Sequence, residues 1–332
     1  VCVRADVTVT MATRKVGLVL DPAAPVGRIE VVDIGVPVVV PPGSPVMHWL
    51  DEAFVCPLVP AFEAGAHKGR RGHLLVVAGS AGKTGAALLT GRGAMRAGAG
   101  LCTIATTAGG QAALDAKVVE LMTATLADGD DLDGGAWAKL EALLPRMRAL
   151  AVGPGMPAGP GSRDFVRRLA AEVALPVVLD ADGLNHLGTE AGAILRAARG
   201  PRVLTPHPGE AARLAGRTTA DVVSNRLEVA RALARDTGAV VVLKGARTLV
   251  AEPDGTVAVN PAATAALGTA GSGDVLTGVI AGLLAQGLGA SEASRLGVYV
   301  HGRAGEDATR ALGSDRLVAG DLPEAVARII AA

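Results

Sequence analysis

The sequence predicts an α/β fold in which a mainly parallel sheet is covered by helices on both faces. Its candidate strands, such as HLLVVA (73–78) and AVVVL (239–243), are continuous apolar runs without the alternation of a half-exposed sheet. Continuous runs are typical of strands that are buried on both faces. Amphipathic stretches of helical length separate these strands along the chain, which is the order of a parallel sheet with crossover helices.

The order of the expected elements supports this fold class. Candidate strands occupy 73–78, 101–106, 149–153, 176–180, 202–205, 239–243, 248–252 and 256–260. Candidate helices occupy 84–98, 132–147, 163–173, 208–215, 219–237, 271–286, 290–311 and 321–331. In such sheets ligands bind at the carboxyl ends of the strands, so the functional residues are expected in the loops that follow them.

The first 60 residues have a different character. Residues 1–36 carry the strand-like pieces VTVT (7–10), GLVL (17–20) and EVVDIGV (30–36), with no helix of useful length between them. The proline-rich segment 37–45 cannot be a central strand or a helix. We therefore expect 37–60 to be a linker or a segment that crosses to a domain covering 61–332.

Composition excludes several classes of function. Lys+Arg and Asp+Glu are 32 each among 332 residues, and only three Phe, two Trp and one Tyr are present, which argues against nucleic-acid binding. No apolar run approaches the roughly 18 residues of a membrane span. Cys2, Cys56 and Cys102 lack metal or redox spacing. We expect a soluble, cytoplasmic protein, cut from a longer polypeptide because Val1 begins a strand-like stretch.

The loop in VVAGSAGKTGAALL (76–89) resembles a phosphate-binding P-loop but does not match it. The motif G-x-x-x-x-G-K-[ST] needs a glycine five positions before Gly82, where this chain has Val77. The nearest glycine, Gly79, comes two positions too late. The loop is too short to wrap two phosphates in the P-loop manner, and another function must explain it.

A second glycine loop, Gly271-Ser272-Gly273-Asp274, opens a strongly apolar helix. Backbone N–H groups and the helix dipole at such a start favour an anion. A carboxylate there would repel a phosphate, unless Asp274 takes a proton from a hydroxyl while the amides hold the phosphoryl group. The alternative is that Asp274 is an ordinary residue in the first turn of a helix.

Two further loops leave strand ends with chemically useful side chains. In LTPHPGE (204–210), Pro206 and Pro208 clamp His207, which is either structural or a ligand contact. In LKGART (243–248), Lys244 ends a buried strand and Gly245 permits close approach. Lys244 either lies in a solvated hairpin or faces the phosphates of a nucleotide.

The loops AVGPGMP (151–157) and LDADGLN (179–185) also follow strands. Gly153 and Gly155 allow a substrate to approach the backbone. Asp180 and Asp182 could organise a magnesium ion through water, or cap the helix that follows. We favour capping.

Taken together, these motifs resemble one family. KGRRGHLLVVAGS…GAALL, VGPG, LDADGLN, LTPHPGE, LKGART and GSGDVLTG occur here in the order found in ADP-dependent NAD(P)H-hydrate dehydratases. That resemblance covers about 60–332 and implies the ribokinase-like three-layer α/β/α fold. Residues 1–36 resemble the C-terminal tail of the NAD(P)H-hydrate epimerase domain, without its nucleotide-binding loop and catalytic acid. We therefore expect no epimerase activity.

The resemblance also implies roles for individual residues. The substrate would contact Ala86, Gly155, His207 and Asp274. The adenine nucleotide would contact Lys244, Gly245, Ala246, Arg247, Thr248 and Gly273. An anion hole would be formed by Gly271, Ser272 and Gly273. Lys83 is incidental in this interpretation. The chain departs from the family's N-P-T-G-N segment, which reads Asn260-Pro261-Ala262-Ala263-Thr264 here.

The implied reaction is repair of the hydrated cofactors NADHX and NADPHX. ADP would phosphorylate the hydrate hydroxyl, with Asp274 as base, and loss of phosphate would restore NADH or NADPH and leave AMP. Mg²⁺ would bridge the phosphates, and a homotetramer or larger homo-oligomer is expected. Two alternatives remain: a small-molecule alcohol kinase of the same fold, and a nucleotide-binding protein without catalysis.

Overall fold

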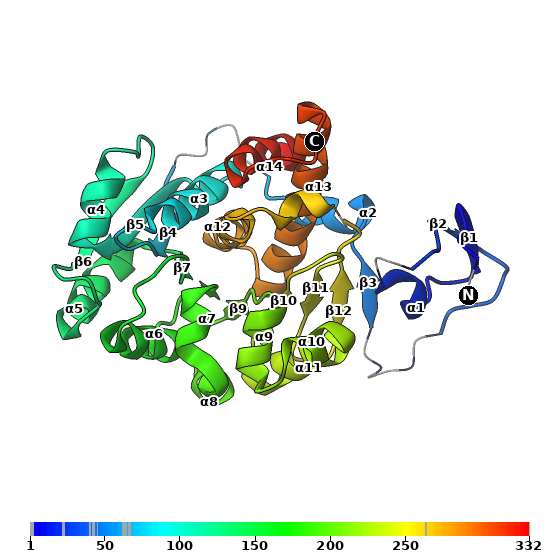
Figure 1. The fold of residues 1–332 in the computed structure, drawn as a ribbon, viewed down its shortest axis with the longest axis horizontal. Coiled ribbons are helices and arrows are strands. Elements are labelled where there is room, and N and C mark those ends of the chain that lie inside the picture. Colours follow the sequence, from blue (N-terminus) through cyan, green and yellow to red (C-terminus); the bar gives the residue numbers. More distant parts are fainter. Residues whose placement is uncertain are drawn as a thin grey trace.

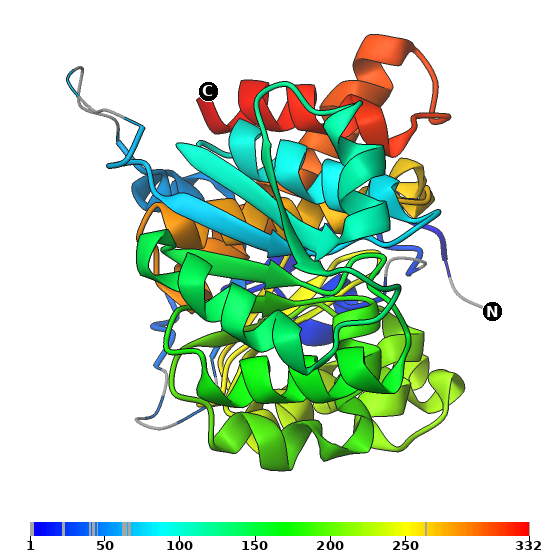
Figure 2. The same ribbon diagram turned by 90° about the vertical axis from the view of Figure 1, so that its left-hand side faces the viewer.

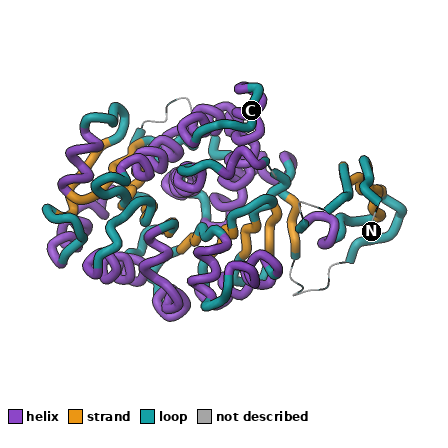
Figure 3. Tube along the Cα trace, in the orientation of Figure 1, coloured by secondary structure: helices purple, strands orange, loops and turns teal. Residues whose placement is uncertain are grey.

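A ten-stranded sheet forms the centre of the computed structural model (Figures 1 and 3). The structure describes residues 3–21, 24–39, 41, 44, 46–61, 65, 68–262 and 264–331. In spatial order the strands are β3 (Met47–Trp49), β12 (Val257–Val259), β11 (Leu249–Ala251), β10 (Val240–Leu243), β9 (Arg202–Leu204), β8 (Val177–Leu179), β7 (Ala149–Val152), β4 (His73–Val77), β5 (Leu101–Thr107) and β6 (Met122–Ala127). All neighbouring pairs are parallel except the two that β11 makes.

Helices cover both faces of this sheet (Figure 2). One face carries α2 (Glu52–Val55), α3 (Thr84–Arg96), α4 (Ala108–Asp115), α12 (Ser272–Ala285), α13 (Ala290–Leu312) and α14 (Leu322–Ala331). The other carries α5 (Gly134–Leu143), α6 (Pro160–Glu172), α7 (Asp182–Leu187), α8 (Ala191–Arg196), α9 (Pro208–Ala215), α10 (Thr219–Ser224) and α11 (Arg226–Thr237).

The strands divide their side chains between the two helical layers. In β4, Leu74 and Val76 belong to the core under α12, whereas Leu75 and Val77 belong to the core under α6 and α9. Successive side chains of a strand point to opposite faces, so a strand covered on both sides must be apolar throughout. This confirms the three-layer α/β/α arrangement expected from the continuous apolar runs.

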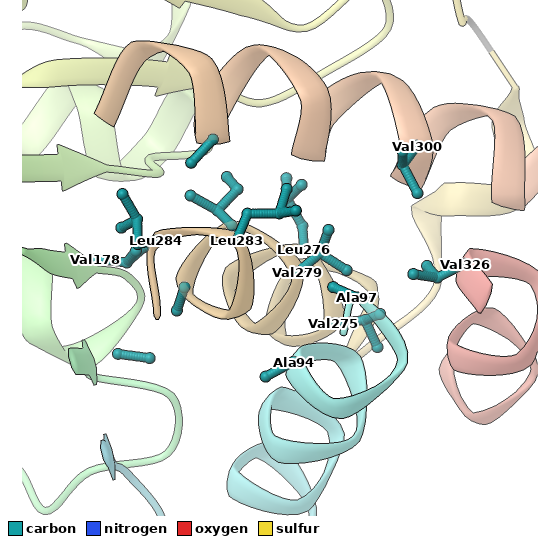
Figure 4. Close-up of a cluster of buried hydrophobic side chains, with 14 of the residues drawn as sticks. Ala94, Ala97, Val178, Val275, Leu276, Val279, Leu283, Leu284, Val300 and Val326 are labelled. Carbon is teal, nitrogen blue, oxygen red and sulfur yellow. The ribbon is translucent and has the colours of Figure 1, made fainter. Parts of the chain in front are cut away.

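Helix α12 is the central helix of its layer. Its side chains from Val275 to Ala285 are buried, with Val275, Val279 and Leu283 directed at the surrounding core (Figure 4). Close packing against α3 depends on Gly278, because a Cβ there would lie 2.0 Å from the carbonyl oxygen of Thr90. The dense packing fixes the helix N-terminus relative to the sheet.

Residues 5–21 and 24–32 form a small unit, called here the N-terminal unit, beside β3 (Figure 1). Strand β1 (Val7–Met11) pairs in parallel with β2 (Arg28–Val32), and α1 (Val16–Val19) lies between them in sequence. The prediction of strands at 7–10 and 30–36 is confirmed in part, since β2 ends at Val32. The prediction of a strand at GLVL (17–20) is wrong, because its first three residues lie in the helix α1 and Leu20 follows that helix.

Other differences concern short elements. Strand β6 and helices α4 and α8 were not expected, α7 is the helix expected to follow Asp180, and the helix predicted at 219–237 is the pair α10 and α11. Residues 47–58, placed in the expected linker, carry β3, α2 and the 3₁₀ turn Cys56–Leu58, and β3 joins the sheet through β12. Cys56 and Cys102 are free thiols; Val1, Cys2, Ala263 and parts of 37–45 lie outside the described residues. No helix in the described parts of the chain is long and apolar enough to cross a membrane.

Candidate active site

Five adjacent strands bring the predicted loops to one edge of the sheet. Strands β10, β9, β8, β7 and β4 are neighbours and run parallel. Their carboxyl ends lead to Lys244, His207, Asp180, Gly155 and Ser80 in that order. This is the edge at which parallel sheets bind ligands. The N-terminus of α12 approaches the same edge, since a Cβ on Gly273 would lie 3.3 Å from Lys244 Nζ.

Lys244 is held by carboxylates. Its Nζ donates to Oδ1 of Asp180 at 2.7 Å and lies 3.6 Å from Oε2 of Glu210. Burial alone would lower the pKa of this lysine, but the nearby Asp180 and Glu210 raise it above its usual value. The ammonium therefore stays charged at neutral pH. Lys244 does lie in the hairpin between β10 and β11, but its side chain is 18% exposed, so the alternative of a solvated lysine is wrong.

Asp180 ties three parts of the site together. Its carboxylate is 1% exposed, accepts from Lys244 at the end of β10, and accepts through Oδ2 from Thr277 Oγ1 of α12 at 2.6 Å. Our preference for a helix cap is wrong, because α7 begins after Ala181 and makes no side-chain cap there. Asp182 lies in the first turn of α7, 3.5 Å from Lys83 Nζ.

Asp274 is the base candidate, and its environment suits that role. Burial raises its pKa, the negative charge of Asp180 raises it further, and the attraction of Lys244 offsets only part, so the pKa reaches about 7. A carboxyl group that titrates near neutrality can accept a proton in one step and release it in the next. Its position in the first turn of α12 confirms the sequence-based placement at a helix start.

The expected anion hole is only partly open. Gly271 precedes α12 with φ +88°, and a Cβ there would lie 2.5 Å from Leu89 Cδ1, so only glycine fits. The backbone N–H of Ser272 already donates to the carbonyl oxygen of Thr269 at 3.3 Å. Gly273, next to the Lys244 ammonium, is therefore the better placed of the predicted amides.

Sequence reasoning missed His301 of α13. Its Nε2 lies 3.0 Å from the carbonyl oxygen and 3.3 Å from Oγ of Ser272, and the side chain is buried. Burial lowers its pKa to about 4, so the ring is neutral and can donate to the Ser272 carbonyl. His301 thus supports the turn that opens α12. No local pattern marks this histidine, because its partner lies 29 residues away.

A cavity of about 420 Å³ opens beside this helix start. Most of the residues predicted to bind the nucleotide line it, together with the apolar side chains of Leu267, Leu276 and Val298. The predicted residues that line it are Lys244, Gly245, Ala246, Thr248, Ser272 and Gly273. Arg247 does not line it: its guanidinium donates to the carbonyl oxygens of Leu18 and Val19.

The altered segment 260–264 borders the same cavity. Asn260 and Thr264 line it. Asn260 Nδ2 donates to the carbonyl oxygen of Val298 at 3.0 Å, and Thr264 Oγ1 accepts from the Ala266 amide at 3.3 Å. Side chains of this segment thus still fix the local backbone.

Ala86 and Gly155 lie together beside the β4–α3 loop. Gly155 has φ +65°, and a Cβ there would lie 3.3 Å from Cβ of Ala86 and 2.8 Å from the carbonyl oxygen of Lys83. Ser80 Oγ donates to the Gly155 carbonyl at 2.9 Å. The loop that resembles a P-loop therefore packs closely against the backbone at Gly155. Ala86 and Gly155, the two predicted contact residues, lie in this packed region.

His207 has a visible structural role. Its Nδ1 accepts from the Gly209 amide at 3.0 Å and caps α9, and its Nε2 lies 3.4 Å from Oε1 of Glu210. Oε2 of the same glutamate accepts from the His207 amide at 2.8 Å and approaches Lys244. The half-exposed ring is thus linked to Lys244 through Glu210. Contact with the substrate stays a prediction.

Comparison with known proteins identifies the family to which this chain belongs. Residues 74–330 match the family model described as NAD(P)H-hydrate dehydratase. The chain is 46% identical over 328 residues to the bifunctional NAD(P)H-hydrate repair enzyme Nnr of Moorella thermoacetica, covering 97% of this chain and 61% of that protein. It therefore spans less than two thirds of that relative. It is 37% identical to the ADP-dependent (S)-NAD(P)H-hydrate dehydratase of Xanthomonas campestris, covering 80% of this chain and 90% of that protein.

Solved structures agree with the sequence relatives. The ADP/ATP-dependent NAD(P)H-hydrate dehydratase from Bacillus subtilis, co-crystallised with ATP and Mg²⁺, superposes with a TM-score of 0.73 at 33% identity, covering 85% of this chain and 97% of that one. A ribokinase-like superfamily protein from Enterococcus faecalis shares the fold with a TM-score of 0.74 at 20% identity, covering 89% and 98%. The sheet-edge site thus lies in a ribokinase-like fold, and the chain belongs to the NAD(P)H-hydrate dehydratase family.

Proposed function

We propose that this chain catalyses the ADP-dependent dehydration of (S)-NADHX and (S)-NADPHX to NADH and NADPH, releasing AMP and phosphate. The observation that carries the proposal is Asp274, a carboxyl group with a pKa of about 7 at the start of α12, close to Lys244 and the nucleotide cavity. Such a group serves a reaction in which a hydroxyl must lose its proton beside a phosphoryl group.

The first step activates a poor leaving group. Asp274 takes the proton of the hydrate hydroxyl while the oxygen of that hydroxyl attacks the β-phosphorus of ADP. The bond from that phosphorus to the bridging oxygen breaks, and its electron pair leaves with AMP. The Lys244 ammonium and the Gly273 amide, which are neighbours, are suited to the negative charge of the transferred group. Phosphate then departs while the ring loses a proton, and the double bond of the reduced nicotinamide returns.

The nucleotide and the hydrate occupy adjacent places in this proposal. ADP lies in the cavity lined by Lys244, Gly245, Ala246 and Thr248, where the apolar side chain of Leu276 suits the adenine base. The hydrated nicotinamide lies toward Ala86 and Gly155, where small residues leave the backbone accessible. Asp274 is close to Lys244, whose charge acts on its pKa, so the base lies near the nucleotide phosphates.

Magnesium fits this site as a companion of the nucleotide. The described residues contain no group of three or more His, Cys, Asp or Glu that could hold a metal by themselves. Mg²⁺ commonly binds through one or two carboxylates plus substrate phosphates. The oxygens of Asp180 accept short hydrogen bonds of 2.7 and 2.6 Å from Lys244 and Thr277, whereas Asp182 makes longer contacts of 3.4 and 3.5 Å, so we propose Asp182 as the protein carboxylate for it. Bound there, the ion would neutralise charge on the phosphates.

Two further features are proposed on the family resemblance. The protein is a cytoplasmic enzyme, and it assembles as a homotetramer or larger homo-oligomer.

The test is recovery of reduced-nicotinamide absorbance from purified NADHX and Mg²⁺, with ADP or ATP in parallel. Recovery with ADP and release of AMP is the expected result, and recovery with ATP alone would overturn the choice of donor. Asp274→Asn should lower kcat by about 10²–10⁴-fold while ADP still binds. Asp164→Asn, an exposed aspartate of α6, is the matched control. Folded protein that binds ADP without restoring NADH would favour an alcohol kinase or a non-catalytic nucleotide-binding protein.

A further inference from the structure

The nucleotide loop contains one long side chain that turns away from the cavity. Arg247 Nη1 donates to the carbonyl oxygens of Leu18 at 3.1 Å and Val19 at 2.6 Å. These carbonyls end helix α1, which lies more than 220 residues earlier in the chain. The contact therefore joins the N-terminal unit, residues 5–21 and 24–32, to the loop Lys244–Thr248.

The same loop faces the nucleotide cavity on its other side. Gly245, Ala246 and Thr248 line the cavity, and Arg247 lies between them in the left-handed conformation, with φ +55°. For a residue with a Cβ this conformation costs roughly 1–2 kcal/mol, so the surroundings must hold it in place. The Arg247 amide donates to the Ala262 carbonyl at 3.0 Å, which fixes one side of the turn.

A second arginine holds the loop backbone. Arg226 of α11 donates to the carbonyl oxygen of Ala246 at 2.7 Å and to that of Arg247 at 3.2 Å. The backbone of the turn is thus fixed by α11 and by Ala262, whereas the Arg247 guanidinium is fixed by the end of α1. Removing the α1 contact would take away the hydrogen bonds of this side chain to Leu18 and Val19 and leave the left-handed residue with fewer restraints.

The N-terminal unit is packed where it meets the loop. Val19 is 5% exposed, and Leu20 packs with Trp49 against the core under α11. The guanidinium carbons of Arg14 and Arg247 lie 5.2 Å and 5.9 Å from the centre of the Trp49 ring, within the range of cation–π attraction. Trp49 belongs to β3, which is paired with β12, so the contact region is anchored in the central sheet.

We propose that the N-terminal unit positions the nucleotide-binding loop through Arg247, so that docking of α1 increases the affinity of the dehydratase site for ADP. The identity of the nucleotide rests on the proposed function. The mechanical coupling between α1 and the loop does not, because it follows from the contacts of Arg247 alone.

Val19→Ser in the full chain tests the coupling, with Val9→Ser as the matched control. Both changes replace a valine of the same unit, but Val9 is 59% exposed in β1, whereas Val19 is 5% exposed and its carbonyl oxygen accepts from Arg247. We expect Val19→Ser to speed amide hydrogen exchange at residues 245–248 and to weaken ADP binding, measured by calorimetry, by about 3- to 10-fold. The kcat at saturating ADP should stay within about twofold, since the loop does not contain the base.

Arg247→Ala shows whether the effect passes through the proposed contact. In that background Val19→Ser should change neither loop exchange nor ADP affinity further, and Arg247→Lys should restore part of the affinity because one donor remains. Equal exchange and equal ADP affinity in Val19→Ser and Val9→Ser would overturn the proposal. So would an undiminished effect of Val19→Ser in the Arg247→Ala background. If no variant binds ADP, the proposed function fails, and exchange at 245–248 still decides the coupling.

Discussion

Burial and the charges around Lys244 together explain why Asp274 can act as a base. One ammonium faces the carboxyl groups of Asp180, Glu210 and Asp274. Asp180 holds the ammonium in a direct hydrogen bond, so Asp274 receives only part of its attraction while it also feels the negative charge of Asp180. Burial above all, and the excess of acidic groups after it, raise the pKa of Asp274 to about 7 and keep its proton in place up to neutral pH.

This arrangement predicts a stability cost that Asp274→Asn removes. Between pH 3.8 and about 7 the folded protein keeps a proton on Asp274 that the unfolded chain releases, so stability falls as the pH rises through this window. A pKa that rises from 3.8 to about 7 corresponds to about 4 kcal/mol. Asp274→Asn should therefore raise the free energy of unfolding by about 2–4 kcal/mol at pH 8 and by almost nothing at pH 4. Urea denaturation at both pH values measures this difference, and an equal effect at both would contradict the assignment.

Asp180→Asn should separate positioning from chemistry. Losing the carboxylate leaves the buried Lys244 without its closest partner, at a cost of about 3 kcal/mol in stability. It also removes a charge that raises the pKa of Asp274, so the acid limb of the kcat/KM profile should move below pH 7. A pH–rate profile with the limb unmoved would show that Asp180 does not tune the base, whatever its effect on stability.

The packing of α12 against α3 sets the position of this cluster, and Gly278 is its narrowest point. A Cβ at Gly278 would lie 2.0 Å from the Thr90 carbonyl, and backbone atoms cannot yield without moving a helix. Gly278→Ala should therefore destabilise the protein by about 3 kcal/mol in chemical denaturation. Gly109→Ala in α4, where no neighbour lies within 4 Å, should be neutral or stabilise by up to about 1 kcal/mol. A similar gain in both variants would mean that helix propensity, not the α3–α12 contact, governs the effect.

The predictable elements are those with strong local patterns. Strands buried on both faces, such as β4 and β10, are continuous apolar runs and were all predicted. Strand β6 (MTATLA) is at the sheet edge, where threonine and alanine suffice, and its sequence shows no such run. GLVL is too short to distinguish a strand from the single helical turn that it forms.

The site divides in the same way. Lys244 and Asp274 could be selected from the sequence because glycine loops mark their positions. The Lys244–Asp180 pair and the His301–Ser272 contact join residues 64 and 29 positions apart, so only the fold reveals them. Arg247 illustrates the limit: its motif suggests a nucleotide contact, whereas its left-handed backbone directs the guanidinium to α1.

Across the molecule, the ten-stranded sheet and the N-terminal unit differ in how deeply their strands are buried. The central strands are buried on both faces, but β1 and β2 form a two-stranded sheet in which Val9 and Met11 are 59% and 61% exposed. A two-stranded sheet is marginally stable by itself. Its order therefore depends on docking at α1 and Trp49.

This difference predicts two levels of opening in native-state hydrogen exchange. Amides of β1 and β2 should exchange through a local opening with a free energy well below that of global unfolding, whereas β7 and β10 should exchange only through global unfolding.

ADP at about 100 times its Kd should add about 2.7 kcal/mol to the free energy of global unfolding. If α1 and the nucleotide loop are coupled, ADP should also slow exchange in β1 and β2, although neither strand contributes to the cavity lining. Amide exchange in β1 and β2 that is as slow as in β7 would show that the N-terminal unit unfolds only together with the core. Protection by ADP that is limited to the dehydratase domain would show that the N-terminal unit does not respond to the nucleotide.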